Sequence, residues 1–332
     1  MRIGINGFGR IGRNFYRAAK QQNAEIEIVA VNDLGSVELM AHLLAHDSVH
    51  GNLGSEISVD GSAIIVGTDR LEVLAERDPA ALPWGDMGVD VVVESTGIFT
   101  KRSTAAAHLE AGARKVVISA PASDVDATFV IGVNDGDYDP SSHHVVSNAS
   151  CTTNCFVPLV KVLDDAFGVQ HGVMTTVHAY TGDQSLVDGP HSDMRRARAA
   201  AVNIVPTSTG AARATGLVLQ AMSGLLDGTA LRVPVPDGSI TDFVAVLNAE
   251  PSKDDINAAF ASAAAEGPLS EVLEYSQAAL VSSDIVGSPA SCVFDSELTM
   301  AHGSLAKVFG WYDNEWGYSN RLVDLVTLMN EG

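Results

Sequence analysis

The residue best placed for covalent chemistry is Cys151. It follows a strand-like run that ends at Ser147 and precedes a helical pattern over 156–167, with Ser150 as the predicted N-cap. A thiol in the first turn of a helix lies at the positive end of the helix dipole, which favours the thiolate. We therefore expect a lowered pKa for Cys151 and, at neutral pH, much faster alkylation than that of free cysteine, whose pKa is about 8.5.

A thiol that attacks a carbonyl carbon needs a base, and His178 is the candidate among the ten histidines. It ends the apolar run 172–177 and opens a polar loop, so its imidazole can project into a cleft. A single histidine at a strand end is more often a hydrogen-bonded structural residue, and this alternative stays open. Cys155, one turn deeper in the helix, and Cys292 are interpreted as small buried thiols.

A dinucleotide fingerprint, Gly7-Phe8-Gly9-Arg10-Ile11-Gly12, follows the apolar run 3–5 and opens a helical pattern. Its glycines allow a tight turn and let a pyrophosphate approach N–H groups at a helix N-terminus. Asp33 ends the next strand, 21 residues after Gly12, where a carboxylate can bind ribose hydroxyls and repel a 2′-phosphate. This pattern predicts NAD rather than NADP. The alternatives are an accidental glycine turn and a turn-capping role for Asp33.

Positive charge on this acidic chain gathers where an anionic substrate could bind. Arg195, Arg196 and Arg198 cluster in the irregular segment 183–202, and Arg232 lies in a strand pattern. The run Thr207-Ser208-Thr209-Gly210 precedes a helix in the manner of an anion nest. Together these features favour a phosphorylated substrate, although a solvated loop or pairing at a subunit interface explains the arginines equally well.

Composition excludes several classes of protein. The formal charge of −21 has the wrong sign for a nucleic-acid backbone or an anionic membrane. We find no apolar run of about 18 residues and no signal-peptide pattern, so we expect a soluble cytoplasmic protein. Three cysteines are too few for a disulfide framework, and the Cys151–Cys155 spacing lacks the further ligands of a metal site, so we expect none.

The elements that must position these residues change character near residue 150. In the first half, strand-like runs alternate with helical patterns, which predicts a doubly wound, mostly parallel sheet of the Rossmann type. The second half has longer strand runs and fewer helices, which predicts an α+β domain. We therefore expect a cofactor-binding domain over 1–150, onto which a C-terminal helix over 316–332 packs back, and a catalytic domain over 151–315 with an interface loop over 183–202. The predicted strands are 2–6, 27–31, 89–94, 115–119, 128–131, 145–147, 172–179, 230–236, 240–248 and 304–311, and the predicted helices are 10–21, 36–44, 103–112, 156–167, 209–225, 253–266 and 320–329.

With fingerprint, thiol and histidine in this order, the chain closely resembles the phosphorylating glyceraldehyde-3-phosphate dehydrogenases, almost from end to end. The matching pieces are residues 5–13, 94–97, 119–121, 147–155, 175–181, 195–198, 209–212 and 311–315. The resemblance implies reversible oxidation of glyceraldehyde 3-phosphate with NAD and inorganic phosphate to 1,3-bisphosphoglycerate, in glycolysis and gluconeogenesis. It also implies a thiohemiacetal and a thioester on Cys151, with His178 as the base, and a homotetramer.

The resemblance also implies binding roles, residue by residue. The substrate-phosphate site would comprise Thr181, Asp183 and Arg232, with Arg195 nearby, and the inorganic-phosphate site Ser150, Thr152, Thr209 and Gly210. Cofactor contacts would come from the glycine turn of Gly7, Gly9 and Gly12 and from Arg10, Ile11, Asp33, Arg77, Thr96, Ser119 and Asn314.

The chain departs from the common pattern at Gly189, where leucine is usual, and at Gly182, where asparagine is common. Gly189 makes the pocket roomier and raises the question of NADP tolerance, whereas Asp33 and Pro190 favour NAD. Two rivals remain. One is an erythrose-4-phosphate dehydrogenase of the same fold, which hydrolyses its thioester; the other is a non-catalytic redox sensor that oxidises Cys151.

Overall fold

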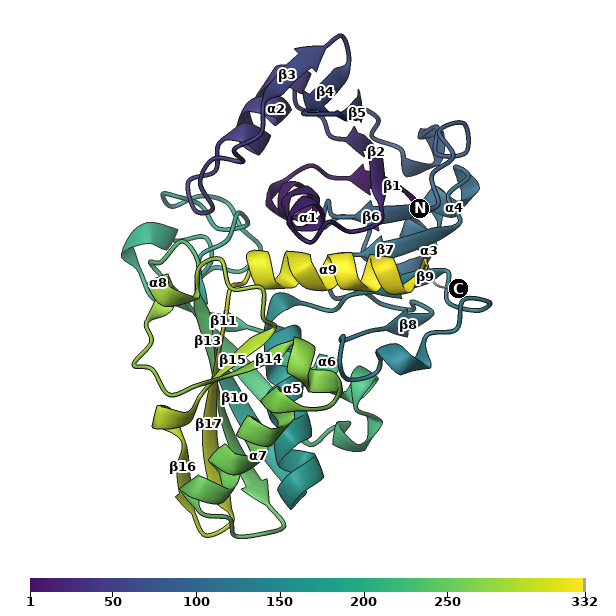
Figure 1. Cartoon of the computed structure of the whole chain (residues 1–332). Coiled ribbons are helices and arrows are strands. Elements are labelled where there is room, and N and C mark those ends of the chain that lie inside the picture. Colours follow the sequence, from purple (N-terminus) through teal and green to yellow (C-terminus); the bar gives the residue numbers. More distant parts are fainter. Residues whose placement is uncertain (331–332) are drawn as a thin grey trace. The chain divides into compact units, whose positions relative to one another are not determined.

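The computed structural model describes residues 1–330 of the chain and divides it into two compact units (Figure 1). Unit 1 comprises 1–129, 137–149 and the C-terminal segment from Ser319 onward, and unit 2 comprises 130–136 and Ser150–Tyr318. Residues 130–136 therefore group with the second unit, whereas the predicted boundary assigned them to the first. None of the helices within residues 1–330 combines the length and the apolar character needed to cross a membrane.

Unit 1 is built on a sheet whose nine strands, counted over the described residues, run in the order β3-β4-β5-β2-β1-β6-β7-β9-β8. Its central strands are parallel, and the buried β-branched residues of β6 suit a strand covered on both faces. The predicted doubly wound sheet is confirmed. Its strands are β1 (Arg2–Asn6), β2 (Glu27–Asn32), β3 (Ile57–Asp60), β4 (Ala63–Val66), β5 (Asp69–Leu74), β6 (Val91–Glu94), β7 (Lys115–Ile118), β8 (Ala127–Thr128) and β9 (Val145–Ser147).

The antiparallel run β3-β4-β5 at one edge of this sheet was not predicted from the sequence. Its strands are short, and β3 is mostly exposed, so the apolar alternation that marks a strand is weak there. The helices of unit 1 are α1 (Arg10–Gln21), α2 (Val37–Ala45), α3 (Arg102–Ala105) and α4 (Ala107–Glu110). The predicted helix over 103–112 is thus two short helices, which meet at Ala106.

The predicted C-terminal helix over 316–332 corresponds to α9 (Trp316–Leu328), and residues 331 and 332 lie outside the described residues. From Ser319 onward this helix belongs to unit 1. There the side chain of Gln22, just beyond α1, donates a hydrogen bond of 2.8 Å to Asn320 Oδ1. Leu322, Val323, Leu325 and Val326 are fully buried.

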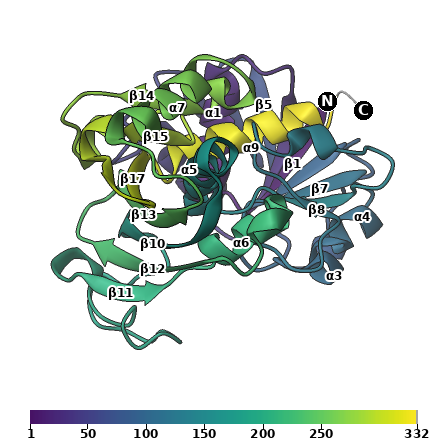
Figure 2. The ribbon, with the colours of Figure 1, turned by 90° about the horizontal axis from the view of Figure 1, so that it is seen from below.

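Unit 2 contains a mixed sheet in the order β11-β12-β10-β13-β17-β15-β14, with β16 paired to β17 (Figure 2). The strands β10 and β12 are parallel, whereas β13 and β17 run antiparallel to their neighbours. The predicted α+β character of this half is confirmed. Its strands are β10 (Val169–Ala179), β11 (Val205–Ser208), β12 (Leu226–Val233), β13 (Ser239–Leu247), β14 (Leu273–Ser276), β15 (Cys292–Asp295), β16 (Met300–His302) and β17 (Leu305–Tyr312).

One face of this sheet is covered by α5 (Cys151–Phe167), which packs on β13, β15 and β17. Its buried side chains, among them Phe156, Leu159 and Leu163, join Phe243 and Phe260 in one apolar core. The predicted helix over 209–225 is wrong in length, because α6 (Ala211–Val218) ends before Leu219, whose backbone is not helical. The remaining helices are α7 (Lys253–Ala265) and α8 (Ser282–Ile285).

Candidate active site

Cys151 is the first residue of α5 and is partly buried. Ser150 caps the helix as predicted: its Oγ accepts a hydrogen bond of 3.1 Å from the N–H of Thr153. Ala149, immediately before the cap, has a φ of +55°, a conformation that L-residues adopt rarely. The chain therefore turns sharply here and delivers the thiol to the helix N-terminus.

His178 lies beside Cys151 because α5, which begins at Cys151, packs against the sheet that contains β10. His178 lies near the end of β10, is almost fully buried, and its Nε2 is 3.5 Å from Cys151 Sγ. Its Nδ1 lies 2.7 Å from the carbonyl oxygen of Ala179, which can accept the Nδ1–H. With the proton on Nδ1, the lone pair of Nε2 faces the thiol and can take its proton; in the other tautomer Nδ1 accepts from Arg232 Nη1 and the Nε2–H faces the sulfur.

Arg232 is the register partner of His178 on β12. Its Nη1 donates to the carbonyl of Ala179 at 3.0 Å and lies 2.7 Å from His178 Nδ1. The guanidinium thus places a permanent positive charge beside the imidazole and the thiol. Such a charge favours an anionic sulfur or oxygen and opposes an imidazolium.

Burial raises the pKa of Cys151 to about 11, although the charge of Arg232 and hydrogen bonds from Thr152 act in the opposite direction. The expectation that the helix N-terminus lowers this pKa is therefore wrong in direction, because burial of the thiolate raises the pKa by more than the nearby charge and hydrogen bonds lower it. Fast alkylation of Cys151 at neutral pH stays a prediction. Burial and the Arg232 charge also lower the pKa of His178 to about 3. At pH 7 the pair is a neutral thiol beside a neutral imidazole.

Tyr312 lies in the matching piece 311–315 but is not among the predicted site residues. Its hydroxyl is hydrogen-bonded to Thr152 Oγ1 at 2.9 Å and to Thr176 Oγ1 at 2.7 Å, and its ring packs edge-on against His178. The hydroxyl of Thr152, predicted to bind inorganic phosphate, is thus engaged with the protein. Because Tyr312 and Thr152 are more than 150 residues apart, no local spacing could have identified their contact.

One of the predicted substrate-phosphate residues, Asp183, is a carboxylate whose negative charge is paired with Arg196. Thr181 Oγ1 donates to Asp183 Oδ1 at 2.6 Å, and Arg196 Nη1 donates to Asp183 Oδ2 at 2.7 Å. Arg196 also donates to Thr207 Oγ1 at 2.9 Å, so it connects the 181–183 segment with β11. The resemblance placed Arg195 near the substrate-phosphate site, and the side chain of Arg195 is exposed. The two arginines are adjacent in sequence, and only the fold distinguishes them.

The predicted inorganic-phosphate residues Thr209 and Gly210 lie just before α6, and Gly210 is its N-cap. Thr209 Oγ1 accepts a hydrogen bond of 3.2 Å from the N–H of Ala211. The first N–H groups of a helix have no partner within the helix, so they can bind an anion.

Asn314 follows β17 and is buried. Its Oδ1 accepts a hydrogen bond of 2.6 Å from Ser239 Oγ, which in turn accepts one of 3.0 Å from the N–H of Ala179. With Oδ1 occupied, Nδ2 is the group of Asn314 that can donate to a bound carboxamide. Ser239 was not predicted, because nothing in its local sequence sets it apart.

The cofactor fingerprint of unit 1 requires glycine for steric reasons. Gly7 has a φ of +93°, and a Cβ there would lie 2.7 Å from the backbone of Ser95. A Cβ on Gly12 would lie 2.2 Å from the carbonyl oxygen of Gly7. A Cβ on Gly9, by contrast, would meet no protein atom within 4 Å, which leaves open space above the turn for a ligand.

A cavity of about 310 Å³ adjoins this turn within unit 1. The groups that line it fit a dinucleotide: the glycine turn at the N-terminus of α1, a carboxylate and an arginine. Asp33 accepts hydrogen bonds from the N–H groups of Phe8 and Leu34, at 2.8 and 2.7 Å, so its carboxylate is fixed beside the turn. Among the lining residues are Gly7, Gly9, Asp33, Arg77 and Thr96.

Three further predicted cofactor residues are Arg10 and Ile11, in the first turn of α1, and Ser119, directly after β7. The guanidinium of Arg10 forms two hydrogen bonds with the carboxylate of Asp47, at 3.0 and 3.1 Å, so its side chain is engaged within the protein. The N–H groups of Arg10 and Ile11 lie in the first helical turn, the position suited to a pyrophosphate. Ser119 directly follows β7, at the carboxyl edge of the sheet, and is partly buried.

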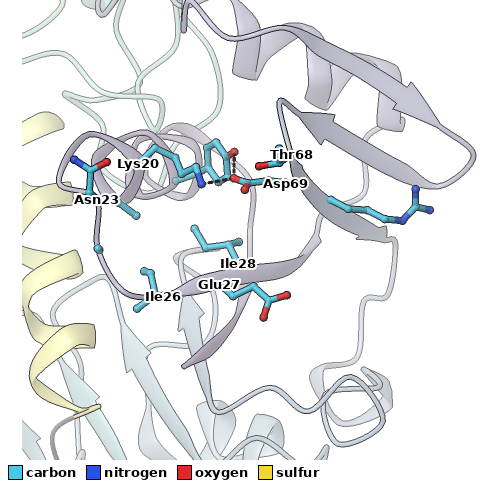
Figure 3. A pocket seen from close by; sticks show the side chains of 11 residues that line it. Lys20, Asn23, Ile26, Glu27, Ile28, Thr68 and Asp69 are labelled. Carbon is cyan, nitrogen blue, oxygen red and sulfur yellow. Dashed lines mark hydrogen bonds and ion pairs between the residues drawn. The ribbon is translucent and has the colours of Figure 1, made fainter.

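A second cavity of unit 1, of about 530 Å³, lies between the end of α1, the start of β2 and the β4–β5 turn (Figure 3). Within it, Tyr16 and Lys20 both bind the carboxylate of Asp69, at 2.7 and 2.5 Å. None of the predicted site residues lines it.

Comparison with known proteins matches both halves of the chain to one family. Residues 1–102 match the NAD-binding domain of glyceraldehyde 3-phosphate dehydrogenase, and residues 150–314 match its C-terminal domain. The chain is 62% identical over 329 residues to glyceraldehyde-3-phosphate dehydrogenase 2 of Streptomyces arenae, covering 99% of this chain and 98% of the relative. It is 60% identical over 330 residues to the glyceraldehyde-3-phosphate dehydrogenase of Streptomyces coelicolor, with the same coverage. The enzyme of that name from Mycobacterium bovis is 60% identical over 337 residues, covering 100% of this chain and 99% of the relative.

Proposed function

The chain belongs to the glyceraldehyde-3-phosphate dehydrogenase family, and on that premise we propose that Cys151 is its nucleophile and His178 its base. The protein is an NAD-dependent oxidoreductase. The observation that carries the proposal is the 3.5 Å contact between Cys151 Sγ and His178 Nε2 at the N-terminus of α5, with Arg232 beside both.

In the first step, the sulfur of Cys151 adds to the aldehyde carbon of glyceraldehyde 3-phosphate, and its proton passes to His178 Nε2. The neutral imidazole is the form that can accept this proton. The negative charge moves to the former aldehyde oxygen, where the Cys151 N–H and the protonated His178 stabilise it. Proton return from His178 completes the thiohemiacetal.

In the oxidation step, His178 takes the hydroxyl proton while the carbon loses a hydride, and a thioester on Cys151 results. NAD supplies the hydride acceptor when bound. Inorganic phosphate then attacks the thioester carbon, the sulfur leaves and recovers its proton, and 1,3-bisphosphoglycerate is released. The reaction is reversible and serves glycolysis and gluconeogenesis.

The binding roles follow from the type of group at each position. We assign the substrate phosphate to Thr181 and Arg232, with Asp183 positioning them and Arg195 nearby. Inorganic phosphate is assigned to Ser150, Thr152, Thr209 and Gly210. The N–H groups of the α1 turn would hold the pyrophosphate of NAD and Asp33 a ribose, and the remaining contacts are assigned to Arg77, Thr96, Ser119 and Asn314.

We also infer a cytoplasmic homotetramer. The segment 183–202 supports the assembly, since it exposes the apolar side chains of Leu186, Val187 and Met194 by 81%, 74% and 88%. A second copy of the chain would cover them.

The experiment is NADH formation with glyceraldehyde 3-phosphate, with and without inorganic phosphate, for the wild type and for Cys151→Ser. Phosphate-dependent turnover in the wild type, and none in a variant that still binds NAD, is the expected result. Turnover that ignores phosphate and prefers erythrose 4-phosphate would support the related dehydrogenase. Turnover by Cys151→Ser would contradict the mechanism, and NAD binding without turnover in the wild type would favour the redox sensor.

A further inference from the structure

A buried carboxylate lies at the carboxyl edge of the unit 1 sheet, and no role proposed above uses it. Glu94 ends β6 and is 1% exposed. Its Oε1 accepts hydrogen bonds from the N–H and the Oγ1 of Thr96, at 2.9 and 2.5 Å. Its Oε2 accepts from Asn6 Nδ2 at 2.6 Å and lies 3.0 Å from His108 Nε2. Both oxygens are therefore fully used.

The tautomer of His108 follows from its other partner. Trp84 Nε1 lies 2.9 Å from His108 Nδ1, and both side chains are fully buried. An indole N–H can only donate, so Nδ1 must be the acceptor. In the neutral imidazole the proton then sits on Nε2 and is donated to Glu94. Trp84 thus fixes His108 as a donor to the carboxylate.

This network reaches the cofactor cavity at three places. Asn6, Thr96 and Phe99 all line the cavity, and Phe99 packs edge-on against His108. Asn6 also accepts a hydrogen bond of 2.7 Å from Asn32, a further lining residue. Asn32 in turn binds both the N–H and the carbonyl of Glu76 at 2.8 Å, which fixes the segment that bears Arg77.

We propose that Glu94, with its His108 and Trp84 supports, is a positioning residue for NAD: it holds Thr96 and Asn6 in the conformation that binds the cofactor. The carboxylate of Glu94 is contacted by four hydrogen-bond donors, so Thr96, Asn6 and His108 must all keep their positions for these bonds to form. In Glu94→Gln, the amide NH₂ would face either the Thr96 donors or the Asn6 and His108 donors, so one pair must move. The proposal concerns cofactor binding and is independent of the roles of Cys151 and His178.

The test is calorimetric titration of the whole protein with NAD, together with thermal unfolding and steady-state kinetics. We expect Glu94→Gln to raise the Kd for NAD by about ten-fold or more, because a buried charged hydrogen-bond partner is lost. Trp84→Phe, which removes only the indole donor, should raise it by roughly three-fold. In both variants KM for NAD should rise while kcat at saturating NAD changes little.

Asp126→Asn is the matched control. Asp126 is a unit 1 carboxylate that accepts hydrogen bonds from the N–H groups of His144 and Val145, at 2.9 and 2.8 Å, and pairs with Arg102. It does not line the cavity, so its variant should lower Tm and leave the Kd unchanged.

An unchanged Kd in a folded Glu94→Gln variant would overturn the proposal, as would a rise of equal size in Asp126→Asn. If Glu94→Gln does not fold, Trp84→Phe decides: wild-type affinity overturns the proposal, and weakened NAD binding with retained kcat supports it. Since calorimetry needs no turnover, failure here leaves the chemistry of Cys151 untouched.

Discussion

Burial and the charge of Arg232 oppose each other at Cys151 but act in the same direction at His178, where both lower the pKa. Desolvation favours the neutral thiol and the neutral imidazole, whereas Arg232 favours the thiolate and disfavours the imidazolium. A neutral imidazole is useful because it can accept the thiol proton at once. The cost is a small thiolate fraction at rest, so the proton transfer must accompany the attack on the substrate.

The first residue-scale prediction concerns Arg232→Gln. Loss of the cation removes a charge that stabilises the Cys151 thiolate, so the alkylation of Cys151 should shift to higher pH by about one unit. The measurement is the rate of iodoacetamide reaction between pH 6 and 10. Cys155 and Cys292 are fully buried, so the reaction reports Cys151. The exposed Arg213→Gln is the control, and an identical profile for Arg232→Gln and the wild type would contradict the assigned electrostatics.

The second residue-scale prediction concerns Asp33→Asn. Phe8 and Leu34 donate to different oxygens of Asp33, so the asparagine oxygen keeps only one of these two hydrogen bonds, and the substitution removes the charge that opposes a 2′-phosphate. We expect kcat/KM for NADP, relative to NAD, to rise by about ten-fold or more. The gain should shrink at high salt, because screening already weakens the repulsion. If the ratio stays at the wild-type value, Asp33 does not set the cofactor preference, and Gly189 becomes the residue to test.

At the scale of elements, register decides which side chains meet. The parallel pairing of β10 and β12 places His178 opposite Arg232, and a shift of one residue would turn both side chains to the other face of the sheet. The turn between β1 and α1 depends on glycines in a different way. A Cβ on Gly7 or Gly12 would collide with the protein backbone, whereas a Cβ on Gly9 would face open space.

The different surroundings of Gly12 and Gly9 predict different effects of alanine at the two positions. Gly12→Ala should destabilise the protein by about 1–3 kcal/mol, because its Cβ would press on the backbone of Gly7. Gly9→Ala should leave Tm unchanged and weaken NAD binding, since its methyl group enters the space assigned to the pyrophosphate. Thermal unfolding without cofactor and calorimetry with NAD separate the two effects. Equal loss of Tm in both variants would show that Gly9 is needed for the fold instead.

At the scale of the whole molecule, the chain combines a charge of −21 with an exposed apolar segment at 183–202. Charge of this magnitude opposes nonspecific association, so a stable oligomer needs a specific apolar contact. Leu186, Val187 and Met194 can provide it.

We therefore expect Leu186→Glu combined with Met194→Glu to dissociate the tetramer into smaller species, measured by sedimentation velocity. Burying two carboxylates in an apolar interface is unfavourable by several kcal/mol. Met300→Glu, at another exposed apolar position in unit 2, should leave the tetramer intact. A tetramer that survives the double substitution would place the interface elsewhere.

The sequence by itself determined the two-part organisation, the doubly wound sheet, the glycine turn with Asp33, and the thiol and histidine, because these depend on local periodicity and on residue types at short spacing. The tertiary structure alone decided that β10 and β12 bring His178 to Arg232, that Arg196 rather than Arg195 binds Asp183, and that Tyr312 holds Thr152. It also showed that burial raises the pKa of Cys151, where the sequence predicted a lowered pKa. A helix N-terminus is visible in the sequence, but the burial of a thiol depends on what packs around it. Contacts between residues distant in the chain, and the desolvation they cause, arise only when the chain folds.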